Sequence, residues 1–277
     1  MLHVFTVLSL FWSFYCHALD GNQVFRVESP SGSLTIVPKS WATQVKKTDS
    51  LLVKQQKANC AQLNMDKCLS FSAGMQSTGF LVKDGSTLLT SLHEFASYLR
   101  ARWQVDPTYQ DVQVPLLISR DGGAPIFGDQ AGDRATLTLI DPSAAQLIKS
   151  DADLTGYVDQ DLVYIRLNRS LGEPVTLGPL QTSGPVSSTG FSLADDVTIQ
   201  TYDGQILPKP RQPYCTLGTI SAWNRLQYAD YVAYEGLSGG PVTNRLGQVI
   251  GLHQGTCTLP DGHEISYFVE LANLLKP

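Results

Sequence analysis

A serine stands among three glycines in Gly236-Leu237-Ser238-Gly239-Gly240-Pro241-Val242, and a proline closes the group. Glycine reaches backbone angles that a side chain forbids, and it lets another chain approach closely. The segment is therefore a poor core strand or helix, and it suits an exposed nucleophile. In that role the N–H groups of Gly236 and Ser238 would hold an oxyanion while the Ser238 hydroxyl attacks the carbon beside it. The alternative is a glycine-rich turn with an idle serine, so the interpretation depends on partners elsewhere.

Two residues at the ends of predicted strands supply such partners. A hairpin is predicted over residues 79–91, and it delivers His93 at its end. Asp161 is the first residue of the alternating stretch 161–167. Each residue alone is more often structural, as a cap, a turn residue or a histidine satisfied by its neighbours. Together with Ser238 they stand in the order histidine, aspartate, serine, which is one arrangement of the charge-assisted catalytic triad.

Three sequence blocks carry a family resemblance. They are Gly79-Phe80-Leu81-Val82 with Leu89-Thr90-Ser91-Leu92-His93, then Asp161-Leu162-Val163-Tyr164-Ile165-Arg166-Leu167, then the serine segment 236–242. In order and spacing they resemble the signature blocks of the chymotrypsin/trypsin-like serine proteases, over roughly residues 70–277. The resemblance implies an all-β fold of two six-stranded antiparallel β-barrels, with the site between them and a short C-terminal helix at 270–275.

The same resemblance assigns roles in a peptide hydrolysis that needs no cofactor or metal. His93 would take the proton of Ser238 as general base and return it to the leaving amine. Asp161 would hold the imidazole tautomer, and Asp159 on the same strand face is the weaker candidate. The N–H groups of Gly236 and Ser238 would form the oxyanion hole. The alternatives are a catalytically inactive relative that serves as a binding module, and an esterase on the same fold.

The serine segment also satisfies the G-x-S-x-G pattern of the α/β-hydrolase nucleophile elbow. That fold requires a helix after the serine, followed by an acid and then a histidine further downstream. Pro241 follows here instead, and Asp261 and His263 lie too close together to fill those parts. The elbow interpretation therefore fails.

Two positions depart from the digestive enzymes of the family. Leu237 stands where those enzymes carry an aspartate that pairs with a freed N-terminus, so this activation switch should be absent. Val232 stands six residues before Ser238, at a position that is acidic in the enzymes that cut after Lys or Arg. Cleavage after basic residues is therefore not expected.

The segment after the serine is predicted to bind the substrate backbone. Its edge Leu252-His253-Gln254, which follows Gly251, is where the family adds an extended substrate as a further strand.

His253 also resembles the pocket histidine of glutamyl endopeptidases and of viral proteases that cut after Gln. This suggests a preference for Glu or Gln before the scissile bond, in a pocket whose floor Val232 and Ala233 leave uncharged. Ala233, where glutamyl enzymes offer a hydroxyl, and the anionic Glu235 weaken the suggestion. The alternative is a structural His253 that is satisfied by a neighbour such as Tyr267.

Composition limits the class of protein. The chain has 277 residues, 43% of them hydrophobic and 16% charged, as expected for a globular and β-rich protein. A net charge of −5 without a long basic run argues against nucleic acid as a partner. The acidic residues Asp151, Asp153 and Asp159 form a solvated face more readily than a calcium loop. We expect a monomer that acts on a protein or peptide.

The chain divides into four predicted segments. Residues 1–18 resemble a secretory signal, because an apolar run too short for a membrane span precedes a small-residue cleavage site. An N-terminal arm is expected at 19–60, the first barrel at 61–175, and the second barrel with the C-terminal helix at 186–277. Within the arm, residues 24–27 and 34–37 are predicted as strands around a turn.

Removal of the signal leaves four cysteines, which allow three pairings. We favour Cys60–Cys68, which closes a short loop, and Cys215–Cys257, which brackets Ser238. The spacing of the first pair is too wide for a zinc C-x₂₋₄-C pair. The prediction is therefore an exported protein, secreted or periplasmic, with no membrane attachment after the signal is removed.

Overall fold

The computed structural model describes residues 19, 22–62, 66–105, 112–121, 123–130, 132–140, 145, 161–193, 198–211, 214–215, 218–219 and 226–272. The predicted signal segment 1–18, the acidic residues Asp151, Asp153 and Asp159, and the second half of the predicted C-terminal helix, 273–275, lie outside these residues. The predicted start of that helix, Glu270, is instead the last residue of a strand. None of the helices in the described ranges is long and apolar enough to cross a membrane.

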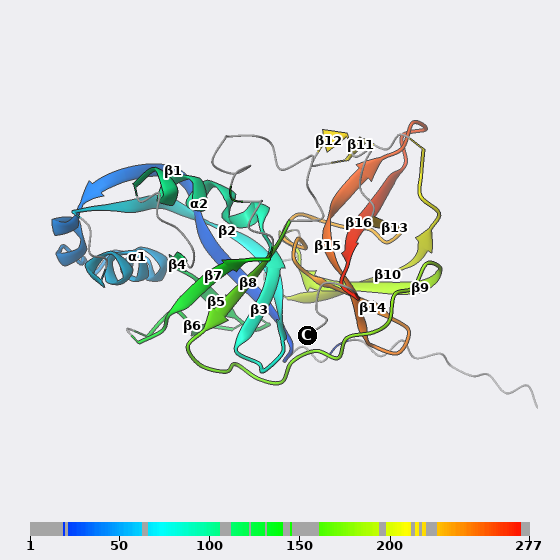
Figure 1. Ribbon diagram of the computed structural model, residues 1–277, viewed down its shortest axis with the longest axis horizontal. Coiled ribbons are helices and arrows are strands. Elements are labelled where there is room, and N and C mark those ends of the chain that lie inside the picture. The colour runs from blue at the N-terminus through cyan, green and yellow to red at the C-terminus, as the bar shows by residue number, and fades with distance from the viewer. Residues whose placement is uncertain are drawn as a thin grey trace, which may run out of the picture.

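Two antiparallel sheets make up the molecule, one at each end of the long axis in Figure 1. The first contains β1 (Val24–Pro38), β2 (Lys67–Val82), β3 (Thr87–Ser91), β4 (Val112–Val114), β5 (Leu117–Ser119), β6 (Pro125–Phe127), β7 (Ala135–Leu139) and β8 (Leu162–Leu167). The second contains β9 (Gly184–Phe191), β10 (Ile199–Leu207), β11 (Tyr214–Cys215), β12 (Gly218–Thr219), β13 (Leu226–Ala229), β14 (Pro241–Asn244), β15 (Val249–Thr258) and β16 (Glu264–Glu270). The helices are α1 (Leu51–Gln62) and α2 (Ala96–Val105), with 3₁₀ turns η1 (Lys39–Thr43) and η2 (His93–Phe95).

The second sheet closes into a barrel, because β15 pairs with both β14 and β16. Its ring runs β15-β14-β9-β10-β13-β16, which matches the six strands expected. The first sheet runs β4-β7-β8-β3-β2-β1-β5-β6 and curls without a ladder between β4 and β6 in the described residues. The all-β, chymotrypsin-like class is confirmed, although the first half is a curled sheet of eight strands.

Residues 24–37 form one long strand, so the predicted pair of strands around a turn is wrong. β1 pairs with β2 from Val24 opposite Phe80 to Pro38 opposite Lys67, and its register shifts between Ser31 and Leu34. Proline and glycine mark bulges as well as turns, and here the extra residues are absorbed in a bulge. The stretch expected to be an arm thus supplies a central strand of the first sheet, flanked by β2 and β5.

Parts of β2, β3 and β8 in the first sheet are buried on both faces, and these parts join the two halves of the molecule. One face carries Leu81, Leu88 and Val163, which belong to the core of the first sheet. The alternate residues Phe80, Leu89 and Leu162 pack in a second cluster with Leu252, Tyr267 and Val269 of the closed barrel. Since side chains alternate along a strand, β2, β3 and β8 serve both cores at once. The ends of β3 and β8 consequently lie beside the closed barrel.

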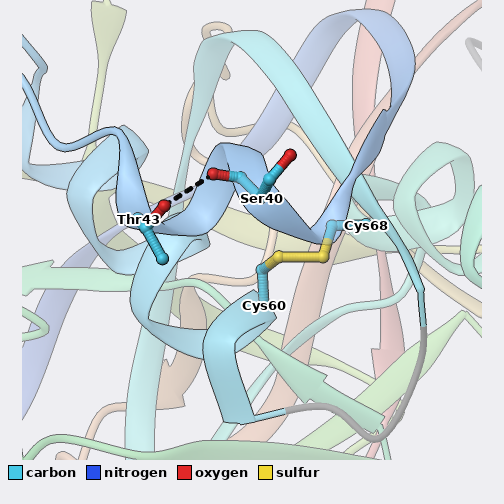
Figure 2. Close-up of a disulfide and its surroundings, with 4 residues drawn as sticks. All are labelled: Ser40, Thr43, Cys60 and Cys68. Atoms are coloured by element: carbon cyan, nitrogen blue, oxygen red, sulfur yellow. Dashed lines mark hydrogen bonds between the residues drawn. A yellow bond between two sulfur atoms is a disulfide. The ribbon is translucent and has the colours of Figure 1, made fainter.

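Both favoured cysteine pairs are bonded. Cys60–Cys68 connects the end of α1 to the start of β2, with 5.6 Å between the two Cα atoms (Figure 2). It packs against Ala42 of η1, the turn in which the Thr43 hydroxyl donates to the Ser40 carbonyl. Cys215–Cys257 joins β11 and β15 at residues that face each other across the ladder.

We predict that loss of the Cys215–Cys257 bridge destabilises the fold more than loss of Cys60–Cys68. The two bridges span sequence separations of 42 and 8 residues. Loop-closure entropy then gives about 4 and about 2.5 kcal/mol of unfolding free energy. Urea unfolding of the two paired Cys→Ala variants, without reductant, measures both differences. Intact mass before and after reduction checks that two bridges exist in the wild type.

Candidate active site

His93 and Asp161 meet because of the β3–β8 ladder. Ser91 pairs with Leu162 at the end of that ladder, and the chain then turns into η2 on one side. The Asp161 carboxylate receives two hydrogen bonds from His93, one from its backbone N–H at 2.6 Å and one from ring Nδ1 at 2.7 Å. This is the contact that the sequence predicts between the general base and its orienting acid.

Gln254 of β15 connects this pair to the closed barrel. Its side-chain N–H₂ donates to the Asp161 carbonyl at 2.8 Å, and its amide oxygen accepts from the Ser91 hydroxyl at 3.1 Å. All three residues are buried. Gln254, predicted to bind substrate, therefore also braces the strand ends that carry His93.

The serine segment forms a tight loop between the two halves. Gly236 and Gly239 have φ of +92° and +84°, which side chains rarely adopt. A Cβ on Gly239 would also collide with the carbonyl oxygen of Thr78, in β2. The predicted reason for glycine, unusual backbone angles together with close approach of another chain, holds at Gly239. Ser238 itself is half-buried.

Two backbone N–H groups of the serine loop are available to bind a ligand. Within the part of the chain that the structure describes, the N–H groups of Gly236 and Ser238 have no hydrogen-bond acceptor. The neighbouring carbonyls of Glu235 and Leu237 are occupied by Leu193 N–H and Gly240 N–H, both at 2.8 Å. An N–H pair without an acceptor beside a serine hydroxyl suits an oxyanion hole.

Ser238 and His93 have other partners in this conformation. The Ser238 hydroxyl donates a long hydrogen bond of 3.5 Å to the Gln254 carbonyl. Ring Nε2 of His93 contacts Oε1 of Glu94 at 3.1 Å. Catalytic hydrogen bonds are often unformed without substrate. A proton transfer from Ser238 to Nε2 of His93 would first require the loss of the contact between Nε2 and Glu94.

The electrostatics of His93 follow from these two carboxylates. Burial lowers the pKa of His93, but the charge and hydrogen bonds of Asp161 and Glu94 outweigh burial and raise that pKa well above 6.5. A neutral imidazole donates from only one nitrogen, so contacts from both nitrogens to carboxylates select the charged ring. In this arrangement His93 is protonated at neutral pH.

His253 is buried against a tyrosine that the sequence analysis did not identify. Its Nδ1 lies 2.9 Å from the hydroxyl of Tyr231, and Nε2 has no hydrogen-bond partner among the described residues. Burial lowers the pKa of His253 to about 3, and the positive charge of His93 adds to this effect. The imidazole is therefore neutral. The hydrogen-bond partner of His253 is Tyr231 and not the predicted neighbour Tyr267. On the β15–β16 ladder Phe268 lies opposite His253, and Tyr267 lies opposite Gly255.

The structure corrects the predicted substrate edge. Gly251 and Leu252 are buried and pair with β14 on one side and β16 on the other. The serine loop continues the first ladder, because His253 exchanges backbone hydrogen bonds with Gly239 and Gly240. Neither Gly251 nor Leu252 can add a substrate strand. On this side of β15, Gln254 and Gly255 lie between the β14 ladder and the β11 ladder, which starts at Cys257.

The predicted pocket floor also needs correction. Val232 is 59% exposed, so it lies at the surface, whereas Ala233 is half-buried and packs against a cluster that contains Tyr231. The buried residue at this level is Tyr231, one position earlier in the chain. The sequence did not distinguish Tyr231 from Val232 as the buried residue, because a loop shows no regular spacing of buried side chains.

Leu237 has a structural role at the position of the missing aspartate. It is fully buried in the apolar cluster of the closed barrel, with Val186, Val242 and Phe268. The loop is therefore anchored by packing, and an ion pair to a freed N-terminus has no counterpart at this position. The described residues also hold no group of three His, Cys, Asp or Glu side chains that could bind a metal ion.

An all-β fold of two packed halves, with a histidine–aspartate pair beside a serine loop, defines the class of chymotrypsin-like serine proteases. The family model of the trypsin-like peptidase domain matches residues 77–252, which is more than half of the chain. The chain belongs to the trypsin-like peptidase family, as the sequence blocks predicted.

Several solved protease structures are similar to this chain at low sequence identity. A variant of the HtrA-type protease AlgW with a decapeptide has a TM-score of 0.50 and 14% identity, over 92% of this chain and 61% of that one. The active form of the Rv3671c protease from M. tuberculosis has a TM-score of 0.45 and 15% identity, over 92% and 80%. Deg5 has a TM-score of 0.48 and 13% identity, over 92% and 86%. No curated protein matches the sequence.

We predict that Glu94→Gln shifts the pH dependence of the protease toward acid. Glu94 raises the pKa of His93, and only the neutral ring is a base, so removal of its charge lets that form appear at lower pH. The acidic limb of the kcat/KM profile should move to lower pH. The exposed Glu264→Gln serves as the charge-matched control, and superimposed profiles for Glu94→Gln and wild type would contradict the prediction.

Proposed function

We propose that this protein is an exported serine endopeptidase that cuts peptide bonds through an acyl-enzyme on Ser238. The observation that carries the proposal is that Gln254 contacts both the Ser238 hydroxyl and Asp161, the partner of His93, beside a loop with two N–H groups that have no acceptor among the described residues. Membership of the trypsin-like peptidase family supports it. The two disulfides fit an oxidising compartment, either outside the cell or in a periplasm.

The proposed reaction begins when substrate replaces the contacts of the resting site. His93 leaves Glu94 and releases its Nε2 proton to solvent, and the neutral ring then accepts the proton of Ser238 at Nε2 as Oγ attacks the scissile carbonyl. The N–H groups of Gly236 and Ser238 hold the resulting oxyanion. His93 then returns the proton to the leaving amine, and the C–N bond breaks. Water, deprotonated by the same ring, hydrolyses the ester and restores the serine.

Asp161 stabilises the imidazolium that forms in both steps. Its carboxylate is fully buried and accepts hydrogen bonds from both the backbone N–H and the ring Nδ1 of His93. Nδ1 therefore keeps its proton while Nε2 accepts and releases one. In both acylation and deacylation the nitrogen that accepts the proton is therefore Nε2.

We propose further that the enzyme prefers Gln or Glu before the scissile bond. In the tautomer that we propose, the Tyr231 hydroxyl donates to Nδ1 of His253, 2.9 Å away, and the ring proton on Nε2 is then a neutral donor toward the substrate side chain. A Lys or Arg side chain would lose hydration there without gaining a partner. Since His253 is already neutral far below physiological pH, a carboxylate gains no ion pair from it. The amide of Gln is thus accepted at least as well as Glu.

Labelling with a fluorophosphonate probe tests the nucleophile. The wild type should form a covalent adduct, and Ser238→Ala should form none. Equal labelling of the two proteins would end the proposal. Persistent binding of a protein partner with no turnover in wild type would instead identify a catalytically inactive binding module. Parallel assays with matched peptide and ester substrates distinguish an endopeptidase from an esterase.

Cleavage of a peptide library tests the specificity. We expect products that end in Gln or Glu, with a Gln-to-Glu ratio that stays constant between about pH 6 and pH 8, because His253 does not titrate there. His253→Ala should lose this selectivity while keeping turnover of a poorly selective substrate. Dominant cleavage after aromatic or aliphatic residues, unchanged in His253→Ala, would leave that histidine a purely structural role.

A further inference from the structure

We propose that Thr78, in β2 of the first sheet, is a positioning residue for the oxyanion hole of the second barrel. The inference rests on the proposed function, and it concerns a residue that touches neither the substrate nor the reacting atoms. Thr78 is fully buried. It comes from the opposite half of the molecule, 158 positions before Gly236 in the sequence.

Thr78 is bonded to the serine loop through two of its groups. Its backbone N–H donates to the Ser238 carbonyl at 2.9 Å. Its hydroxyl donates to the Gly236 carbonyl at 2.8 Å and accepts from the Phe191 N–H at 2.9 Å. The carbonyl of Thr78 accepts in turn from the Thr90 hydroxyl of β3 at 2.7 Å. Strands of both halves are therefore linked through this one residue.

These bonds complete a set of five consecutive carbonyls, Tyr234 to Ser238, that all accept a hydrogen bond. Leu237 N–H, Leu193 N–H and Gly240 N–H occupy the carbonyls of Tyr234, Glu235 and Leu237. Thr78 occupies the remaining two, on Gly236 and Ser238. A peptide unit is planar and its C=O and N–H point in opposite directions, so each held carbonyl fixes the direction of the N–H next to it.

The Gly236 carbonyl is the critical one. It lies between the two peptide units whose N–H groups form the hole. Gly236 has a positive φ, and because glycine also adopts negative φ readily, its backbone could change to another turn conformation. If its carbonyl were free, the 236–237 peptide could rotate and carry the flanking N–H groups with it. The Thr78 hydroxyl prevents that rotation, because a buried carbonyl that loses its donor cannot recover a partner from water.

Threonine fits this place for two reasons. A hydroxyl supplies one donor and accepts at the same time, as the contacts to Gly236 and Phe191 require. Its β-branch restricts the side-chain torsion, so the hydroxyl stays directed at the loop. Two glycines also make room for it, since a Cβ on Gly190 would lie 2.6 Å from the Thr78 hydroxyl oxygen and one on Gly239 would strike the Thr78 carbonyl.

The test compares Thr78→Val, which keeps the shape and removes the hydroxyl, with Thr78→Ser, which keeps the hydroxyl. Loss of one oxyanion donor costs about 10²–10³ in kcat, and a misdirected donor should cost part of that. We expect kcat of Thr78→Val to fall about 10–100-fold with KM within about threefold. Affinity for a peptide boronate, whose adduct on Ser238 occupies the hole, should fall in parallel. Thr78→Ser should recover both.

Thr243→Val is the matched control. Thr243 is a buried threonine of β14 whose hydroxyl donates to the Ser187 carbonyl at 3.3 Å, outside the serine loop. It should keep wild-type kcat and boronate affinity. Should Thr78→Val not fold, Thr78→Ala, which removes the hydroxyl without filling the site, gives the same comparison with Thr78→Ser.

The outcomes distinguish failure of the proposed function from failure of the proposed role of Thr78. Wild type that neither reacts with fluorophosphonate nor cleaves peptides would overturn the proposed function itself. An active wild type with unchanged kcat and boronate affinity in Thr78→Val would overturn only the role of Thr78. A raised KM with unchanged kcat would also overturn it, because the residue would then serve ground-state binding.

Discussion

The carboxylate of Asp161 is completely buried, and His93 donates a hydrogen bond to each of its two oxygens. A buried charge without such partners would be too costly to retain. The pair fixes where η2 starts after β3 and where β8 begins. Gln254 then reaches the Asp161 carbonyl from the closed barrel, so one ion pair in the first sheet sets the position of the strand beside the nucleophile.

The two halves of the molecule are consequently not independent modules. β2, β3 and β8 have one face in each core, so a change in either core alters the surface on which the site is assembled. The polar contacts follow the same division. His93 and Asp161 come from one half and Ser238 with its loop from the other, while Thr78 and Gln254 reach across in opposite directions.

Local patterns in the sequence were sufficient for the hairpin at 79–91, the strand that follows Asp161, the glycine loop around Ser238 and both cysteine pairs. The family blocks were sufficient for the class of fold. The single strand β1 was missed because Pro30 and Gly32 mark a bulge as readily as a turn. Glu94, Thr78 and Tyr231 were missed because a contact partner carries no local pattern. The only sequence signal for these contacts was that Glu94 is adjacent to His93 and Tyr231 is adjacent to Val232.

The separation of 158 positions between Thr78 and Gly236 has a consequence for how the protein is made. A chain that is synthesised from its N-terminus contains β2 long before the serine loop, and domains generally fold as units in that order. Neither half alone can direct the loop, because the donor and the acceptor belong to different halves. The proposed hydrolysis would therefore begin only when the halves dock, so that a nascent or broken chain would not digest its neighbours. Docking of the halves would then do for this site what the ion pair to a freed N-terminus, absent at Leu237, does in the digestive enzymes.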